Sequence, residues 1–225
     1  MVASALVTVH EMRGPRRRLI ETLQANGIRD LAVLRAFDEV PRHLFVPTGV
    51  SHRAYEDSAL PIGSGQTISQ PSIHALYLDV LGLTGRERVL EVGTGSGFQT
   101  ALLARLAAQV FTIERVNALM DRAKEVLRSL GVNNVSFLVG DGTIGWREYG
   151  PYDAILVGAG SPTVPQPLID QLAVGGRLLC PVGDRAKQEV VLVRRDLSGI
   201  RTTTITDARF VPLVGTHGWV EGAPT

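Results

Sequence analysis

The stretch Arg88-Val-Leu-Glu-Val-Gly-Thr-Gly-Ser-Gly-Phe98 decides the fold of this chain. Its short apolar run breaks into a glycine-rich turn and then into a helical pattern, which predicts a buried strand, a turn and a helix. The three glycines let the backbone turn sharply and let a ligand approach it closely. Glu91 ends the strand aimed into the turn, and Glu114 ends the next apolar run, where an acid suits the paired hydroxyls of a ribose. Together these features predict a nucleoside-binding site.

The spacing of the glycines narrows the choice of nucleoside. A dinucleotide-binding turn has the spacing GxGxxG, which places the N-terminus of a helix opposite the pyrophosphate. This turn has the spacing GxGxG, and Glu91 lies two residues before its first glycine. A carboxylate there would repel a pyrophosphate and attract the ammonium group of S-adenosylmethionine. No phosphate-binding loop of the form GxxxxGK followed by Ser or Thr occurs in the sequence. Electrostatics therefore favours a sulfonium cofactor over NAD or ATP, although the turn alone could also be an ordinary strand-to-helix connection.

The composition is that of a globular protein with a substantial core. The chain has 225 residues, of which 44% are hydrophobic and 20% charged. A formal net charge of +1 and an aromatic content of 5% argue against a nucleic-acid partner, because such proteins need a basic surface or stacking platforms. The single cysteine, Cys180, lies in an apolar run and is expected in the core. Because the sequence has only this one cysteine and five scattered histidines, we expect no metal site.

The first residues do not read as an export signal. Residues 1–9 are mildly apolar, but His10, Glu11 and Arg13 follow too soon. No apolar run has the length needed to span a bilayer, so we expect a cytoplasmic protein without a membrane partner. The neighbouring arginines at positions 13, 16, 17 and 18 are interpreted as a solvated helix face rather than a nucleic-acid site.

Strand-like and helix-like segments alternate through the middle of the chain. The expected strands cover residues 88–92, 110–114, 135–139, 153–157, 176–181 and 189–194, and the expected helices 98–107, 117–130 and 165–172. This alternation predicts an α/β fold with a doubly wound, mostly parallel sheet. The β-branched runs between Val190 and Phe210, broken at residues 196–199, predict an antiparallel end, which brings the expected sheet to seven strands.

Before this region the sequence predicts an N-terminal extension of helices and loops. Helices are expected over residues 16–26 and 30–40, and another begins at Pro71, which suits a first helical position. The stretch 41–69 between them is rich in loops. We expect a single domain over 1–225, in which residues 1–70 carry the extension and an active-site loop, 71–195 the cofactor-binding core, and 196–225 the last strands and tail.

Four loops are expected to meet where the ligand binds, because ligands of doubly wound sheets lie beyond the carboxyl ends of the strands. These loops cover residues 93–97, 114–117, 140–142 and 158–162. Asp141 follows the third strand and could accept a hydrogen bond from an adenine amino group. We favour this role over that of an ordinary turn aspartate, which the following glycine would also suit.

Several segments resemble the protein-L-isoaspartate O-methyltransferase family. The most specific is Pro61-Ile-Gly-Ser-Gly-Gln-Thr-Ile-Ser-Gln-Pro71, which is similar to the signature loop of that family. The other similar segments are Val40-Pro-Arg-His-Leu-Phe-Val-Pro47, Ala54-Tyr-Glu-Asp57, the glycine turn, Gly140-Asp-Gly142, Leu172-Ala-Val-Gly-Gly-Arg-Leu178 and Arg209-Phe-Val-Pro-Leu-Val214. The resemblance extends over residues 18–219. Residues 158–162 are richer in glycine than the family pattern, which affects the expected acceptor pocket rather than the cofactor site.

The resemblance implies an S-adenosylmethionine-dependent methyltransferase fold and the repair of damaged proteins. The methyl group would pass to the α-carboxylate of L-isoaspartyl residues in proteins and peptides, the ester would collapse to a succinimide, and S-adenosyl-L-homocysteine would remain. Ser69 would be the active-site hydroxyl. The candidate substrate-binding residues are Thr67, Ile68, Val211, Pro212 and Leu213. The candidate cofactor-binding residues are Gln66, His74, Glu91, Gly93, Thr94, Gly95, Ser96, Gly97, Glu114, Arg115, Asp141 and Gly142. We expect a monomer.

Elementary chemistry agrees with this reaction. A carboxylate acceptor has a pKa of about 3.5–4 and is already a nucleophile at neutral pH, so no general base is required. Ser69 could orient that carboxylate or could simply cap the following helix. His74 is expected in a supporting role. Two other functions stay open: a methyltransferase of the same scaffold for a dedicated peptide or small-molecule carboxylate, and a cofactor-binding protein without transfer activity.

Overall fold

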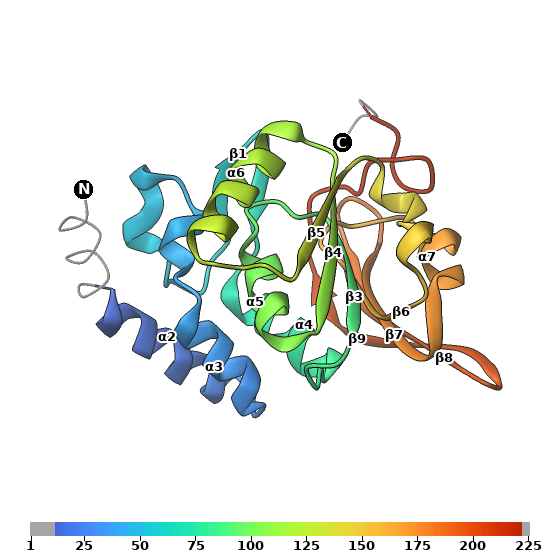
Figure 1. Ribbon diagram of the computed structural model, residues 1–225, viewed down its shortest axis with the longest axis horizontal. Helices are drawn as coiled ribbons and strands as arrows, with labels where there is room; N and C mark the ends of the chain where they lie inside the picture. Colours follow the sequence, from blue (N-terminus) through green and yellow to red (C-terminus); the bar gives the residue numbers. More distant parts are fainter. Residues whose placement is uncertain (1–11, 222–225) are drawn as a thin grey trace.

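A seven-stranded sheet with helices on both faces forms the centre of the computed structural model, which describes residues 12–221 (Figure 1). The strands lie in the order β5-β4-β3-β6-β7-β8-β9. Their bounds are β3 Arg88–Val92, β4 Gln109–Glu114, β5 Val135–Val139, β6 Tyr152–Val157, β7 Leu172–Gly183, β8 Gln188–Asp196 and β9 Gly199–Ala208. The helices are α2 Arg13–Ala25, α3 Leu31–Glu39, α4 Pro71–Leu81, α5 Phe98–Leu106, α6 Asn117–Ser129 and α7 Gln166–Asp170.

Strand β3 lies at the point where the order of the sheet reverses. It pairs in parallel with both β4 and β6, and the parallel part continues to β5 on one side and to β7 on the other. Strands β8 and β9 complete the sheet in antiparallel pairs. The predicted doubly wound sheet with an antiparallel end is therefore confirmed. The carboxyl end of β3 lies at the switch point, where such sheets bind their ligands.

The two faces of the sheet bury separate parts of the core. In β3, Val89 packs in one cluster with Leu78 of α4 and Leu102 of α5. Its neighbour Leu90 points to the other face and packs with Leu168 of α7. Figure 1 shows the same arrangement, with α4 and α5 on one side of the central strands and α7 on the other. Burial on both faces explains why the central strands are continuous apolar runs rather than alternating ones.

The stretch 41–69, which the sequence predicts to be loop-rich, contains short regular elements. These are the 3-10 helices η1 Arg42–Phe45 and η2 Thr48–Arg53 and the hairpin of β1 Leu60–Gly63 and β2 Gln66–Ile68. The hairpin turns through Gly63, Ser64 and Gly65, whose φ values of 94°, 51° and 67° are all left-handed. A Cβ on Gly95 would lie 3.7 Å from Ile62 Cδ1, so the hairpin packs directly over the glycine turn.

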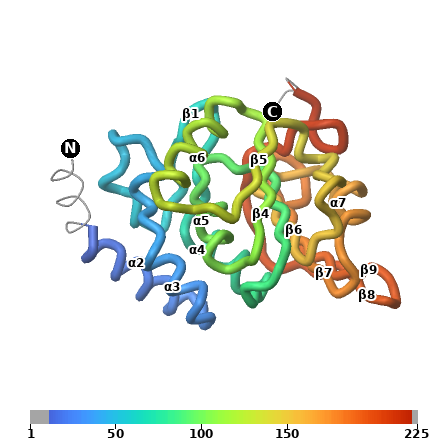
Figure 2. The backbone as a smooth tube through the Cα atoms, viewed as in Figure 1, coloured from blue at the N-terminus to red at the C-terminus, as the bar shows by residue number. Residues whose placement is uncertain are grey.

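Residues 210–221 form what we call the C-terminal strap, which crosses the carboxyl edge of the sheet (red in Figure 2). Gly160, in the loop after β6, holds it from both sides. The Gly160 amide donates to Val211 O at 2.8 Å, and Gly160 O accepts from the Leu213 amide at 2.7 Å and from Trp219 Nε1 at 3.0 Å. Two further 3-10 helices, η3 Gly142–Ile144 and η4 Arg147–Tyr149, connect β5 to β6. Within residues 12–221, no helix has the length and apolarity to cross a membrane.

Candidate active site

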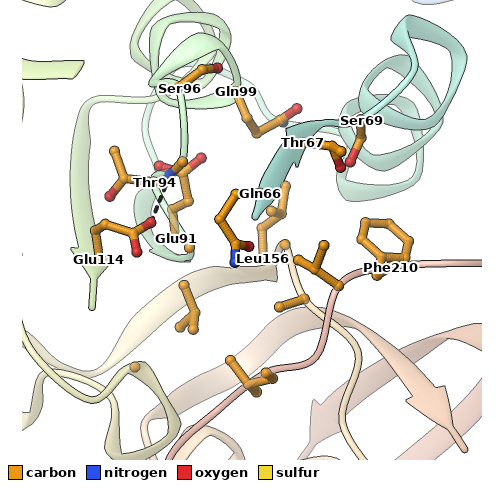
Figure 3. Close-up of a pocket in the computed structure, with 18 of the residues that line it drawn as sticks. Gln66, Thr67, Ser69, Glu91, Thr94, Ser96, Gln99, Glu114, Leu156 and Phe210 are labelled. Carbon is orange, nitrogen blue, oxygen red and sulfur yellow. Dashed lines mark hydrogen bonds between the residues drawn. The ribbon is translucent and has the colours of Figure 1, made fainter. Parts of the chain in front are cut away.

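A pocket at the switch point of the sheet brings together most of the predicted site residues (Figure 3). Its walls come from the β1–β2 hairpin and the start of α4, the loops after β3, β4 and β6, and the C-terminal strap. All the predicted residues line it except Gly97 and Asp141. The lining residues that were not among the predicted site residues are Ile73, Tyr77, Val92, Gln99, Ile113, Val116, Leu156, Gly158, Ala159, Phe210 and Val214. Three of these, Val116, Gly158 and Ala159, lie in loops that the sequence predicted to meet there.

Glu114 fixes the glycine turn to the end of the neighbouring strand. Its Oε2 accepts the Gly95 amide at 2.8 Å, the bond dashed in Figure 3, and its Oε1 accepts the Val116 amide at 2.9 Å. A carboxylate has about four acceptor sites, so both oxygens keep capacity for the hydroxyls of a ribose. The side chain is buried at the pocket wall, where water competes little for those sites.

Gly97, in the glycine turn, and Gly142, in the loop after β5, let neighbouring side chains pack closely against the backbone. Gly97 has a left-handed φ of 85°, and a Cβ there would lie 2.9 Å from Ala123 Cβ in α6. Gly97 is the N-cap of α5 and is absent from the pocket lining, so the structure gives it a role in packing. A Cβ on Gly142 would lie 2.4 Å from Val92 Cγ1, which explains the glycine after Asp141.

Glu91 is completely buried, and only one of its two oxygens is occupied. Its Oε2 accepts hydrogen bonds from the hydroxyls of Thr100 and Thr112, both at 2.6 Å, while Oε1 has no partner. Burial raises the pKa of the carboxyl to about 7; the two hydroxyls act against this shift, and the nearby Glu114 adds to it. Without a ligand the group is therefore close to half protonated at neutral pH, and a cation beside Oε1 would favour its ionised form.

His74 and Gln99 form a hydrogen-bonded pair across the pocket wall. His74 Nδ1 is bonded to Gln99 Oε1, and His74 Nε2 and Gln99 Nε2 are both buried without a partner. Burial lowers the pKa of His74 to about 3; the guanidinium of Arg42 lowers it further, and Gln99 and the Ser69 carbonyl oppose the shift. The imidazole is therefore neutral at pH 7 and carries no charge into the pocket.

Ser69 lines the pocket opposite the glycine turn, and its backbone is anchored from behind by a buried arginine. Arg42 is 1% exposed and donates to Ser69 O at 2.9 Å and to Ala54 O at 2.8 Å, with its guanidinium 4.9 Å from the Phe98 ring centroid. Burial lowers the pKa of Arg42 to about 9, with Asp57 acting against the shift, so it remains cationic at neutral pH.

The alternative role of Ser69 as a helix cap is wrong. The N-cap of α4 is Gln70, whose side chain makes no capping hydrogen bond. The Ser72 amide instead donates to Asp57 Oδ1 at 2.8 Å. Among the hydrogen bonds of the described residues, none involves the Ser69 hydroxyl. This hydroxyl is therefore available to a ligand in the pocket.

Asp141 lies beside the pocket rather than in its wall. Its Oδ1 accepts from the Thr143 amide at 2.8 Å and from the Thr143 hydroxyl at 2.6 Å, and its Oδ2 accepts from the Thr216 amide at 2.8 Å. Partial burial would raise its pKa, but these hydrogen bonds lower it overall. The structure shows Asp141 anchoring the C-terminal strap, and the adenine contact stays a prediction. Arg115 lines the pocket and pairs with Glu221 of the same strap.

The unsatisfied polar atoms around the pocket fit S-adenosylmethionine. Buried atoms without a hydrogen-bond partner cost about 1–3 kcal/mol each and are rare in native proteins. Within the described chain, four such atoms belong to residues that line this one pocket: His74 Nε2, Tyr77 OH, Glu91 Oε1 and Gln99 Nε2. Acceptors and donors are both present, as an ammonium group and a carboxylate require, and Glu114 adds acceptors for a ribose.

Comparison with known proteins agrees with this geometry. The sequence profile of the family described as Protein-L-isoaspartate(D-aspartate) O-methyltransferase (PCMT) matches residues 14–218. The chain belongs to this family. Its curated relatives include the protein-L-isoaspartate O-methyltransferase of Syntrophus aciditrophicus, 51% identical over 91% of this chain and 95% of the relative, and protein-L-isoaspartate O-methyltransferase 1 of Syntrophobacter fumaroxidans, 53% identical over 91% and 96%.

Solved structures of the family have the same fold. A protein-L-isoaspartate O-methyltransferase superposes with a TM-score of 0.83 at 32% identity, covering 90% of this chain and 67% of the other. A Plasmodium falciparum protein of the same description superposes with a TM-score of 0.77 at 27% identity, covering 88% and 98%. The latter was solved in complex with S-adenosyl-L-homocysteine. The predicted family and the predicted methyltransferase fold are thereby confirmed.

Proposed function

We propose that this protein methylates the α-carboxylate of L-isoaspartyl residues in damaged proteins and peptides, in the pocket between the Ser69 loop and the glycine turn. S-adenosyl-L-methionine is the methyl donor and S-adenosyl-L-homocysteine the product. One observation carries the proposal: the free hydroxyl of Ser69 and the two acids Glu91 and Glu114 line the same pocket. The names of the relatives and the bound ligand of the Plasmodium falciparum structure support the same reaction.

The chemistry needs little from the protein beyond positioning. The cofactor supplies an activated methyl group on a sulfonium, so an acceptor carboxylate oxygen forms the new C–O bond as the C–S bond breaks and leaves a neutral thioether. The carboxylate and sulfonium charges cancel in this step, and no proton has to move. Alignment in a water-poor site can supply on the order of 7–11 kcal/mol of the barrier. The buried Ile68 and the half-buried Phe210 at the pocket wall exclude water from the reacting oxygen.

In this proposal Ser69 donates a hydrogen bond to one oxygen of the acceptor carboxylate and leaves the other oxygen to attack. A neutral donor orients the nucleophile without neutralising it. The cation of Arg42 contacts Ser69 only through its backbone carbonyl, because the hydrogen bonds of Arg42 go to carbonyl oxygens and its side chain is absent from the pocket lining. Arg42 therefore holds the Ser69 loop in place and does not pair with the substrate.

The cofactor lies across the glycine turn in the same proposal. Glu114 accepts the ribose hydroxyls, and Glu91 Oε1 accepts from the ammonium group. The strap residues Val211, Pro212 and Leu213 face the peptide acceptor from the other side of the pocket. We further propose that the protein works in the cytoplasm as a monomer, without a nucleic-acid or membrane partner.

Replacing Ser69 with alanine tests the assignment. A hydrogen bond to a charged group contributes about 1.5–3 kcal/mol, so kcat on an isoaspartyl peptide should fall about 10- to 100-fold. The dissociation constant for S-adenosyl-L-homocysteine, measured by calorimetry, should stay unchanged. Ser129→Ala is the matched control, since Ser129 lies on the exposed face of α6 and its hydroxyl bonds only to Val126 O. Equal losses of turnover and cofactor affinity in Ser69→Ala would show that the serine is structural.

A further inference from the structure

Gln99 occupies a position between the glycine turn and the Ser69 loop that the sequence motifs do not mark. It lies in the first turn of α5, two residues after Gly97, and is 6% exposed. In Figure 3 its side chain extends from α5 into the gap between Ser96 and Thr67. One end of its amide is bonded to His74, and the other end, Nε2, is buried without a partner in the pocket wall.

The bond between Gln99 and His74 decides what the imidazole offers to the pocket. An amide oxygen can only accept, so the hydrogen must be on His74 Nδ1, and Nε2 is left as a bare acceptor. The low pKa of His74, about 3, keeps the ring neutral and preserves this acceptor over the physiological range. Without Gln99, the ring could carry its hydrogen on either nitrogen.

Three unsatisfied atoms among the pocket residues complement a zwitterion. Gln99 Nε2 is a donor, whereas His74 Nε2 and Glu91 Oε1 are acceptors, and all three belong to residues that line one pocket. A carboxylate needs the donor and an ammonium group needs the acceptors. The amino-acid end of S-adenosylmethionine carries both groups on one carbon, whereas adenine and ribose carry no charged group that would require this set.

We propose that Gln99 is a cofactor-binding residue: its amide nitrogen donates to the carboxylate of the cofactor's amino-acid end, and its amide oxygen holds His74 as an acceptor for the ammonium group. This inference rests on the proposed use of S-adenosylmethionine and adds a residue to that site. It also gives His74 a definite role as a neutral acceptor held by its neighbour.

Truncated ligands test the inference with calorimetry alone. The ligands are S-adenosyl-L-homocysteine, its decarboxylated form, which keeps the ammonium group, and 5′-methylthioadenosine, which lacks both groups. In Gln99→Leu the loss of a hydrogen bond to a charged group should weaken S-adenosyl-L-homocysteine about 10- to 100-fold. The decarboxylated form should lose much less, and methylthioadenosine should be unaffected. Gln109→Leu is the matched control, because Gln109 lies outside the pocket and bonds to Ser136 at 3.3 Å.

A second variant keeps the inference testable if Gln99→Leu does not fold. Gln99→Glu retains an oxygen that accepts from His74 but faces the cofactor carboxylate with another carboxylate. The ratio of the dissociation constants of S-adenosyl-L-homocysteine and its decarboxylated form should therefore rise. Equal losses for all three ligands, or no loss for S-adenosyl-L-homocysteine, would overturn the role of Gln99 while leaving the proposed function intact. If the wild-type protein bound none of the three ligands, the proposed function would fall and this inference with it.

Discussion

Replacing Glu91 with glutamine should make the stability of the free protein less dependent on pH while weakening its affinity for a cationic ligand. The carboxyl is fully buried, and its Oε2 accepts from the hydroxyls of Thr100 and Thr112, so a glutamine oxygen can take over both bonds. The substitution removes the charge and puts an amide nitrogen in the place of the unpartnered Oε1, a change whose cost does not vary with pH. The wild-type protein must ionise this group inside the fold, whereas the unfolded chain ionises it in water.

The size of the effect follows from the raised pKa. A carboxyl whose pKa rises from 4.5 to about 7 on folding binds its proton more tightly in the folded state. Its contribution to stability is fully present below pH 4.5 and is lost as pH rises to 7. At about 1.4 kcal/mol per pH unit the whole loss is about 3 kcal/mol, of which about 2–3 kcal/mol falls between pH 5 and pH 8. A glutamine side chain does not titrate, so the variant avoids this loss.

Urea unfolding of both proteins at pH 5, 6, 7 and 8 measures the effect. The difference in free energy of unfolding, Glu91→Gln minus wild type, should increase by about 2–3 kcal/mol from pH 5 to pH 8. Affinity for S-adenosyl-L-homocysteine should be lower in the variant, and the wild type should release a proton on binding near neutral pH. Parallel stability curves for the two proteins would refute the reasoning, because they would show that Glu91 ionises in the fold as easily as in water.

Two further substitutions test the packing around the site. Gly97→Ala should destabilise the protein by about 2 kcal/mol or more in urea unfolding, because it adds left-handed strain and a contact at 2.9 Å with Ala123. In the control Gly27→Ala, at a φ of 98°, the new Cβ would meet open space, so the loss of stability should come from the strain alone. Equal losses of stability in the two variants would contradict the packing argument. Asp141→Asn should lower the free energy of unfolding by about 1–2 kcal/mol, because the side chain of asparagine has one acceptor oxygen and cannot replace both carboxylate oxygens that accept from Thr143 and Thr216. The variant should also show faster hydrogen exchange at residues 216–219. Unchanged exchange there would show that Asp141 does not anchor the strap.

The local pattern of the sequence was sufficient to predict the sheet. Strands β3, β4 and β5 are short apolar runs bounded by turn residues, and the expected ranges for β3 and β5 coincide with the observed ones. The glycine turn and the two acids could be located for the same reason, since a ligand site at the end of a strand is encoded within a few residues. The hairpin of β1 and β2 was missed, because its strands are only four and three residues long.

The residues that sequence analysis missed depend on contacts between distant segments. Gln99 looks like an ordinary polar residue of a helix, and only its meeting with His74, 25 positions earlier, makes it part of the site. Arg42 becomes a buried anchor through Ser69, 27 positions later. Asp141 turns toward Thr216, 75 positions later, and its local pattern could not distinguish that contact from one with adenine. Such partners are set by tertiary packing, which no local pattern records.

Transfer of a labelled methyl group to paired peptides tests the central claim most directly. The protein is incubated with methyl-labelled S-adenosylmethionine and two peptides of the same sequence, one with L-isoaspartate and the other with L-aspartate at a single position. The account predicts labelled ester on the isoaspartyl peptide alone. Label on neither peptide, although the cofactor binds, would contradict it by showing a binding protein or an enzyme with a different, dedicated carboxylate acceptor.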